Sequence, residues 1–182
     1  MGMSVIVAAA RESDAEQIFR LQYLCFQSEA ERYGNYRIEA LVESLDSVRA
    51  SVGRDCVFVA RLGDEVVGAV TGTVGEDGTA RIGKLCVHPR LQRHGLGARL
   101  LLAVERALTT ERGASLLRLH TGHRSDLNLR LYRRAGYAAV GDTTVDGVQQ
   151  IVLEKAAPTG RSTPPAPDGR RAAPDTRTAR LR

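Results

Sequence analysis

Hydrophobic and polar residues alternate with two different periods along the first 155 residues of the chain. An apolar residue at every second position is typical of strands, and one at every third or fourth position is typical of helices. The first pattern predicts strands at 4–8, 56–62, 66–74, 80–87, 116–120, 137–141 and 148–153. The second pattern predicts helices that begin near residue 13 and then cover 38–52, 95–112 and about 125–136. Because strands and helices alternate, the chain is predicted to form a mixed α/β sheet.

Turn and cap residues mark the ends of several of these elements. The string Ser-Asp-Ala-Glu at 13–16 has the spacing of a capping box and predicts the start of the first helix. A polar stretch with two tyrosines, 29–36, is expected to follow that helix. Turn residues at 63–64 and 77–78 predict tight connections between neighbouring strands, so these strands are expected to pair antiparallel.

The last 27 residues differ from the rest in composition. They hold five of the six prolines, six arginines against two aspartates, and no aromatic residue. Such a segment cannot bury enough apolar surface to form a core, so 156–182 is predicted to be a disordered Pro/Arg-rich tail and 1–155 a single domain. The tail carries +4 of the net charge of +5. The basic charge therefore does not indicate a specific nucleic-acid partner for the domain.

Several other classes of protein are not indicated by the sequence. No run approaches the roughly 18 apolar residues of a membrane span, and the early apolar run at 5–10 lacks the preceding Lys or Arg of a signal peptide. Cys25, Cys56 and Cys86 are odd in number and have no C-x-x-C spacing, so they predict neither a disulfide framework nor a metal site. The chain is expected to be cytoplasmic, with no membrane partner and no metal.

The most informative segment runs from 87 to 101, where a predicted strand passes through a short loop into a helix. The loop and the first helical residue read Gln92, Arg93, His94, Gly95, Leu96, Gly97 and Ala98. A helix N-terminus leaves four backbone N–H groups without intrahelical partners and carries a partial positive charge. The two glycines let an anion approach these amides, while the arginine and the histidine add donors. The loop is therefore predicted to bind a diphosphate.

Spacing narrows the choice of diphosphate ligand. The dinucleotide fingerprint G-x-G-x-x-G fails because Leu100 occupies its third glycine position, and the Walker string G-x-x-x-x-G-K-[ST] does not occur. The string V-x-P-x-x-Q-R-x-G-x-G-x-x-L-L resembles the acyl-CoA signature of the GNAT superfamily of N-acetyltransferases. Eight positions match it: Val87, Pro89, Gln92, Arg93, Gly95, Gly97, Leu100 and Leu101. The alternative interpretation is an ordinary strand–loop–helix connection with two glycines.

A second string resembles a later motif of the same family, N-x-x-A-x-x-L-Y-x-x-x-G-[FY]. Its matching residues are Leu131, Tyr132, Gly136 and Tyr137. Two positions depart from the motif, because Ser125 stands where asparagine is usual and Asn128 stands where alanine is usual. In the family the asparagine helps to hold the pantetheine arm of CoA. Asn128 lies about one helical turn further along and is the candidate to replace that contact.

The resemblance implies a fold, a cosubstrate and two sets of site residues. The fold is that of the GNAT acyltransferases, a central, mostly antiparallel sheet flanked by helices, and the cosubstrate is acetyl-CoA. In this family, backbone groups at the end of the fourth strand bind pantetheine and polarise the thioester carbonyl. By position these groups belong to Leu85, Cys86 and Val87. Tyr132 matches the tyrosine that donates to the departing thiolate, and packing in the core is the alternative role for it.

The general base is the least defined part of the predicted site. Some relatives carry a glutamate on the strand before the loop, but 81–87 contains no carboxylate. His120 is a candidate because histidine titrates near neutral pH. His123, Glu29 and Glu31 are further options, and a chain of water molecules with no dedicated base is the alternative.

Two functions stay open on the sequence. The first is an acetyl-CoA-dependent N-acetyltransferase that acts on an amine of a small molecule or a peptide, and a homodimer is compatible with such an enzyme. The second is a non-catalytic acyl-CoA-binding sensor or regulatory module. Tyr132 favours the first function, whereas Ser125 and the missing strand carboxylate leave room for the second.

Overall fold

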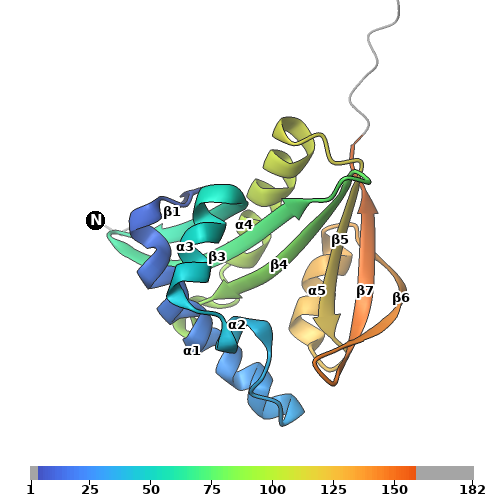
Figure 1. The fold of residues 1–182 in the computed structure, drawn as a ribbon, viewed down its shortest axis with the longest axis horizontal. Coiled ribbons are helices and arrows are strands. Elements are labelled where there is room, and N and C mark those ends of the chain that lie inside the picture. Colours follow the sequence, from blue (N-terminus) through green and yellow to red (C-terminus); the bar gives the residue numbers. More distant parts are fainter. Residues whose placement is uncertain (1–3, 159–182) are drawn as a thin grey trace, which may run out of the picture.

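The protein, whose structure is a computed structural model, is described over residues 4–158. Seven strands form one sheet in the order β1-β2-β3-β4-β5-β7-β6 (Figure 1). Their bounds are β1 Val5–Ala9, β2 Cys56–Leu62, β3 Glu65–Val74, β4 Thr79–Val87, β5 Leu116–Gly122, β6 Ala138–Val145 and β7 Val148–Ala156. All neighbouring pairs are antiparallel except β4 and β5, which run parallel. The predicted mixed α/β fold with a mostly antiparallel sheet is confirmed.

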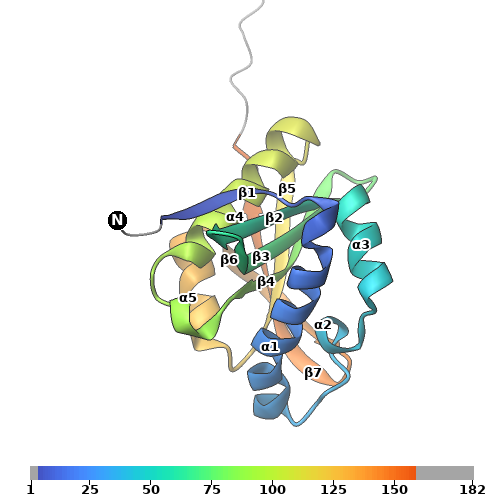
Figure 2. The same ribbon diagram turned by 90° about the vertical axis from the view of Figure 1, so that its left-hand side faces the viewer.

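Helices cover both faces of this sheet. Their bounds are η1 Glu12–Asp14, α1 Ala15–Tyr33, α2 Glu39–Val42, α3 Leu45–Arg54, η2 Pro89–Leu91, α4 Leu96–Arg106, the π-helical turn η3 Ala107–Glu111 and α5 Asp126–Arg134. Figure 2 shows the sheet between two helical layers, with α1 and α3 on one side and α4 and α5 on the other. Of the tail predicted at 156–182, residues 159–182 lie outside the described part of the chain, and the domain boundary stays a prediction.

Each helical layer has its own buried apolar cluster. Helix α4 and the turn η3 that continues it contribute four side chains at intervals of one, three and four residues, all at most 1% exposed: Leu100, Leu101, Val104 and Leu108. On the opposite face Ile18 and Leu21 of α1 pack among the valines of β2 and β3. An apolar stripe at this spacing faces the sheet, because 3.6 residues complete one helical turn. The two clusters fix α1 and α4 on opposite sides of β4.

The start and the end of the first helix differ from the prediction. The predicted capping box at 13–16 is wrong. The carboxylate of Asp14 instead accepts a hydrogen bond from the backbone N–H of Arg11, three residues earlier, at 2.7 Å. Helix α1 also continues through part of the polar stretch and ends only at Tyr33. Gly34, with φ 61°, supplies the left-handed residue that ends it. The polar residues near its end are therefore helical, and this places them on defined faces.

The single helix predicted at 38–52 is two helices. Glu43 between α2 and α3 has an extended backbone, with φ −63° and ψ 141°. Ser44 then caps α3, because its side chain accepts a hydrogen bond from the Ser47 backbone N–H at 3.1 Å. The break turns Glu43 out of the helical register and toward β4.

Strands β4 and β5 separate part-way along their length, as Figure 1 shows. They pair over 79–82 and 116–119, and beyond that point β4 pairs only with β3 and β5 only with β7. The register between β3 and β4 shifts near the same place. There Lys84 has φ 53°, a left-handed conformation that residues with a Cβ rarely adopt. A bulge of this kind bends a strand, so β4 leaves its parallel neighbour and opens a gap in the sheet.

An ion pair holds Lys84 at this bulge. Its Nζ donates to Glu43 Oε2 at 2.8 Å and lies 3.1 Å from Glu39 Oε1. The Glu43 side chain is 6% exposed and also accepts a hydrogen bond from Gln22 Nε2 at 3.1 Å. Burial raises the pKa of the Glu43 carboxyl, but the hydrogen bonds and the charge of Lys84 outweigh it and hold that pKa below its usual value.

Replacement of Glu43 by glutamine is expected to lower the free energy of unfolding by about 3 kcal/mol, because it leaves the buried charge of Lys84 without its main partner. Glu43 stabilises the fold fully above the unfolded pKa of about 4.3, and the contribution is lost as the pH falls through the lower folded-state pKa. The difference between the wild type and Glu43→Gln should therefore shrink in acid.

Urea titrations at neutral and acidic pH measure this difference. Glu39→Gln is the control, because Glu39 contacts the same lysine but its side chain is 76% exposed. It should cost less than about 1 kcal/mol. Equal losses in the two variants would contradict the role of the buried ion pair.

Candidate functional site

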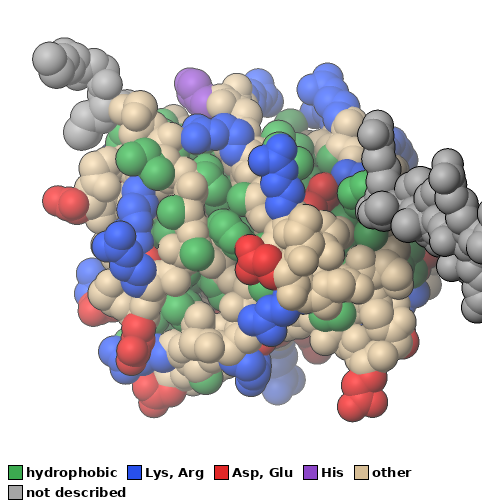
Figure 3. Space-filling model, turned by 90° about the horizontal axis from the view of Figure 1, so that it is seen from above, with side chains coloured by type: hydrophobic (Ala, Val, Ile, Leu, Met, Phe, Trp, Pro, Cys, Tyr) green, Lys and Arg blue, Asp and Glu red, His purple; other side chains and the backbone are tan. Residues whose placement is uncertain are grey.

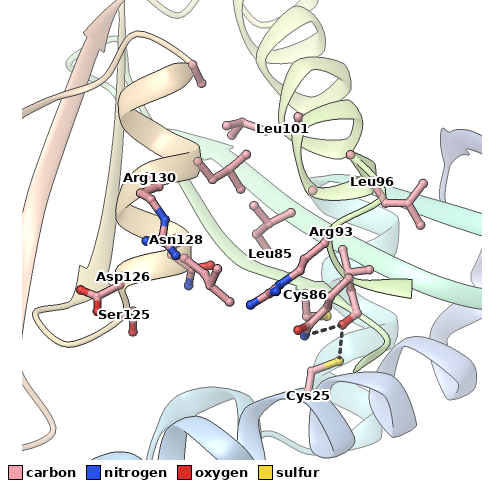
Figure 4. A pocket seen from close by; sticks show the side chains of 18 of the residues that line it. Cys25, Leu85, Cys86, Arg93, Leu96, Leu101, Ser125, Asp126, Asn128 and Arg130 are labelled. Atoms are coloured by element: carbon pink, nitrogen blue, oxygen red, sulfur yellow. Dashed lines mark hydrogen bonds between the residues drawn. The ribbon is translucent and has the colours of Figure 1, made fainter. Parts of the chain in front are cut away.

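A cavity of about 1010 Å³ lies between α1, α4 and α5, at the gap that β4 and β5 leave in the sheet. Strand β4 forms its floor, and the three helices with the loop before α4 form its walls (Figure 4). Ten of the eleven residues predicted to bind the cofactor line it: Leu85, Cys86, Val87, Gln92, Arg93, Gly95, Leu96, Gly97, Ala98 and Asn128. The eleventh, His94, is exposed and does not line the cavity; its ring nitrogen Nδ1 lies 2.8 Å from the Gln92 carbonyl oxygen.

The floor offers backbone groups that are free of the sheet. The His88 N–H donates to the Val67 carbonyl of β3 at 2.8 Å. Antiparallel pairing alternates, so the N–H and C=O of Val87 turn away from β3 and toward the gap. The Val87 carbonyl accepts hydrogen bonds from Gln92 Nε2 at 3.3 Å and from the thiol of Cys25 at 3.4 Å (Figure 4). An amide of an extended ligand can pair with the strand at this edge.

The loop before α4 has the backbone that an anion cradle requires. Arg93 and Gly95 both have left-handed φ values, 65° and 77°, and Gly95 is the N-cap of α4. The first intrahelical bond near this end runs from Arg99 N–H to Gly95 C=O at 3.1 Å. The amides of the first helical turn therefore have no partner within the helix and line the cavity. A Cβ at Gly97 would lie 3.3 Å from Leu131 on α5, so a larger side chain there would fill the space between the two helices.

The two departures from the second motif both lie at the start of α5. Ser125 is 3% exposed, and its hydroxyl lies 3.4 Å from the Tyr33 hydroxyl and 3.5 Å from Arg32 Nη1. Asn128 lines the cavity and donates weakly, at 3.5 Å, to the hydroxyl of Thr121. Both residues line the cavity, and Ser125 is also bound to the end of α1. The replacement of the usual asparagine by Asn128 stays a prediction.

Tyr132 lies behind the cavity wall and is not among the residues that line the cavity. Its side chain is 5% exposed, and its ring packs edge-on against Tyr137 with centroids 6.1 Å apart. Burial and the nearby charge of Glu29 raise the pKa of the Tyr132 hydroxyl, so the phenol is protonated at all physiological pH values. The neighbouring Tyr137 instead donates its hydroxyl proton to Glu105 at 2.8 Å.

The two candidate histidines lie outside the cavity. On β5 the side chains of Leu117 and Leu119 are buried against α4, so His120 points to the opposite, exposed face. Burial and the charges of Arg81 and Arg118 lower the pKa of His120. His123 packs against Tyr33 with the two rings tilted and their centroids 5.6 Å apart, and it does not line the cavity.

One wall of the cavity was missed by the sequence analysis, except for Glu29. It is the face of α1 formed by Cys25, Ser28, Glu29 and Arg32. These residues follow the three- and four-residue spacing of one helical face, and that spacing was the available signal. Burial raises the pKa of the Glu29 carboxyl, and the charge of Arg32 lowers it by a smaller amount. Glu31, the other carboxylate option, is exposed and does not line the cavity.

A buried ion pair forms part of the cavity wall. Glu105 of α4 is 7% exposed and accepts hydrogen bonds from Tyr137 at 2.8 Å and from Lys155 of β7 at 2.9 Å. The sequence contains one sign of this ion pair, because Glu105 is an acidic residue within the apolar face of α4. Since both carboxylate oxygens already have donors, this group ties α4 to the sheet.

The surface shows no single concentration of charge on the face drawn in Figure 3, where basic and acidic side chains are interspersed. Within residues 4–158, no helix is both long and apolar enough to cross a membrane. The same residues contain no group of three or more metal-ligating side chains.

Comparisons with known proteins agree on one family. Residues 15–137 match the acetyltransferase (GNAT) family. Among solved structures, the fold is similar to PaiA N-acetyltransferase from Thermoplasma acidophilum in complex with coenzyme A, at a TM-score of 0.71 and 17% identity over 85% of this chain and 99% of that one.

Two further solved structures are similar. One is the ribosomal-protein-S18-alanine N-acetyltransferase of Escherichia coli, at a TM-score of 0.69 and 17% identity over 88% and 98% of the two chains. The other is yncA of Salmonella typhimurium with its cofactor acetyl-CoA, at a TM-score of 0.70 and 15% identity over 94% and 98%. No curated protein matches the chain.

Cys25 is expected to react with iodoacetamide before the other two cysteines. A hydrogen bond from Cys86 lowers the pKa of the Cys25 thiol against the effect of its partial burial, and the thiolate is the reactive form. The pKa of the Cys86 thiol is raised by its hydrogen bond to Cys25 and by its burial. Burial also raises the pKa of the Cys56 thiol. Mass spectrometry of peptides after brief labelling gives the order. Earlier labelling of Cys86 or Cys56 would show that the described arrangement of thiols is incorrect.

Proposed function

This chain belongs to the acetyltransferase (GNAT) family and is an acyltransferase, and from that premise we propose that it moves an acetyl group from acetyl-CoA to a primary amine. The observation that carries the proposal is one continuous cavity that joins the cradle before α4 to the free edge of β4. The acceptor in this proposal is a small molecule or the amine of a peptide. The proposed transferase domain is 1–155, and the separate tail at 156–182 stays a prediction from the sequence.

In the proposed complex the diphosphate of CoA lies on the amides from Gly95 to Ala98, with Arg93 beside it. Backbone amides and a guanidinium are suited to phosphate oxygens, since they donate in fixed directions. The pantetheine arm follows the β4 edge from Leu85 to Val87, with the Asn128 amide on the other side. Two of the similar structures hold CoA or acetyl-CoA, and this supports the choice of ligand.

Acetyl transfer begins when the lone pair of the amine nitrogen attacks the thioester carbonyl carbon. A C–N bond forms and the carbonyl oxygen becomes an oxyanion, which needs a donor aimed at it. The Val87 N–H, turned into the gap, is the proposed donor. Collapse of the tetrahedral intermediate re-forms the carbonyl and breaks the C–S bond. The nitrogen loses one proton and the sulfur of CoA gains one, so the products are an amide and free CoA.

Tyr132 is the proposed donor to the departing sulfur. Its raised pKa makes it a weaker acid than a free tyrosine, so complete transfer of its proton to a thiolate is uphill. It therefore acts by a hydrogen bond that strengthens as charge develops on sulfur, and solvent supplies the final proton. His120, which was the candidate base, faces away from the cavity, and the proposal does not route the amine proton through it.

A sensor that binds acyl-CoA without turnover is the second candidate. The observation that favours it lies on β4: some relatives carry a glutamate on this strand, whereas this chain has no carboxylate there and its Lys84 is already paired with Glu43. The two functions differ in one readout, the release of free CoA in the presence of amines.

Calorimetric titration with acetyl-CoA should show saturable one-site binding, and NAD, as a control for other diphosphates, should give no heat. Gly97→Val should weaken the affinity for acetyl-CoA by about tenfold or more, because its side chain would fill the space beside Leu131. Gly53→Val is the matched control, because Gly53 lies on exposed α3 with nothing near its Cβ position. Unchanged affinity in a folded Gly97→Val protein would exclude the proposed position of the diphosphate.

Tyr132→Phe should lower kcat by roughly a hundredfold while the affinity for acetyl-CoA stays near that of the wild type. The loss is expected because the hydroxyl acts only as the sulfur departs. Steady-state release of CoA, followed with a thiol reagent, measures it. Tyr137→Phe is the control, since that hydroxyl is bound to Glu105 and its loss should affect stability and not kcat. An unchanged kcat in Tyr132→Phe would remove this residue from the mechanism.

A further inference from the structure

The end of α1 and the start of α5 meet at the cavity edge in a network that fixes two arginines. The Arg124 backbone N–H donates to the Tyr33 hydroxyl at 2.8 Å, and its Nη1 donates to the Arg32 carbonyl oxygen at 3.1 Å. Arg32 in turn points its Nη1 at the Ser125 hydroxyl, 3.5 Å away. Both arginines line the cavity. Both guanidinium groups are therefore held at the same edge of the cavity by neutral partners.

Neither guanidinium is neutralised by a salt bridge. The nine ion pairs within residues 4–158 include six other arginines but neither Arg32 nor Arg124. Two positive charges at one edge of the cavity attract an anion to that edge. Arginine pairs of this kind are well suited to carboxylates, because each guanidinium donates two parallel hydrogen bonds.

A carboxylate lies one helical turn from this arginine pair. Glu29 is three residues before Arg32 on the same face of α1, so their side chains are neighbours. Of the other carboxylates that line the cavity, Glu105 is bound to Tyr137 and Lys155, and Asp126 is exposed at the start of α5. Burial raises the pKa of Glu29, and a bound cation would offset the cost of its ionisation.

We propose that the acceptor is a free α-amino acid, with its ammonium group on Glu29 and its carboxylate on Arg32 and Arg124. This inference rests on the proposed acetyl transfer and names its substrate class. The alternating charges of Glu29 and the two arginines match the opposite charges at the two ends of such a molecule. A peptide with a blocked carboxyl group, or an amine without one, would leave the arginine pair unmatched.

The position of the pair also separates it from the phosphates of CoA. Figure 4 shows Ser125 and Asp126, which directly follow Arg124, on the other side of the cavity from Leu96 at the cradle. The diphosphate and the amino-acid carboxylate therefore occupy different ends of the cavity. Loss of Arg124 should affect the acceptor and leave the affinity for acetyl-CoA nearly unchanged.

The test compares each of the twenty standard L-amino acids with its C-terminal amide in the CoA-release assay. The amide keeps the side chain and has a less basic amine, so a preference for the free acid cannot come from easier deprotonation. For the best substrates we expect kcat/KM to favour the free acid by about ten- to a hundredfold, as lost hydrogen bonds to a charged group predict. Equal or faster acetylation of the amides would overturn the proposal while leaving the transferase function in place.

Variants locate the effect within the chain. Arg124→Gln and Arg32→Gln should remove most of the preference for the free acid, and Glu29→Gln should weaken binding of both forms through the shared ammonium group. Arg133→Gln and Glu31→Gln are the matched controls, because Arg133 lies on α5, which begins two residues after Arg124, Glu31 lies on α1 beside Arg32, and neither lines the cavity. A preference that survives in Arg124→Gln and Arg32→Gln would overturn the assignment of these residues.

Calorimetry keeps the inference testable if no amine is acetylated. In that case the proposed transferase function fails, and the twenty amino acids and their amides are titrated into the protein–CoA complex. Binding of a free acid that is lost in Arg124→Gln would support the amino-acid subsite in a sensor. No binding of any free acid would overturn it.

Discussion

The ion pair between Lys84 and Glu43 is the contact on which the site depends. It holds a left-handed residue in the middle of β4, at the position where this strand leaves β5. Without the bulge the parallel pairing would continue, and the backbone groups of Val87 would bond to a neighbouring strand. The gap in the sheet is therefore a local defect that costs energy, and a buried salt bridge between distant segments stabilises it.

The two helical layers convert this gap into a cavity with two different ends. Helix α4 and its glycine-containing loop bring partial positive charge to one end, from the side that carries the larger core. Helix α1 brings a carboxylate and an arginine to the other end, from the opposite side of the sheet. Two molecules that enter from opposite ends can meet at the free edge of β4. Direct transfer between two substrates needs this geometry.

Local sequence patterns predicted the parts of the site that are contiguous in the chain. The loop at 92–98 could be assigned because glycine spacing and a helix start occur together within a few residues. The order of strands and helices followed from the spacing of hydrophobic residues alone. His94 was assigned with its neighbours, but the left-handed turn at Arg93 and Gly95 directs it to solvent.

Contacts between distant segments could not be predicted in this way. The polar face of α1 was not predicted, because the helix was expected to end before the tyrosine-bearing stretch. Residues in a loop share no common face, so their spacing carried no information. The pairing of Glu43 with Lys84 joins positions 41 residues apart and needs a helix break that no proline or glycine marks. His120 was a reasonable candidate by chemistry, but the face on which it lies depends on the register of β5 with its neighbours.

Gly122 at the end of β5 controls how closely α1 approaches the sheet. A Cβ built there would overlap the hydroxyl of Tyr33, whose ring lies directly over this glycine. Tyr33 in turn supports Arg124 and Ser125. The width of the proposed acceptor end therefore depends on the absence of a side chain at a residue outside the cavity wall. In a protein of this architecture, a single methyl group added on β5 can change the size of the acceptor that the cavity admits, while every residue that touches the acceptor stays the same.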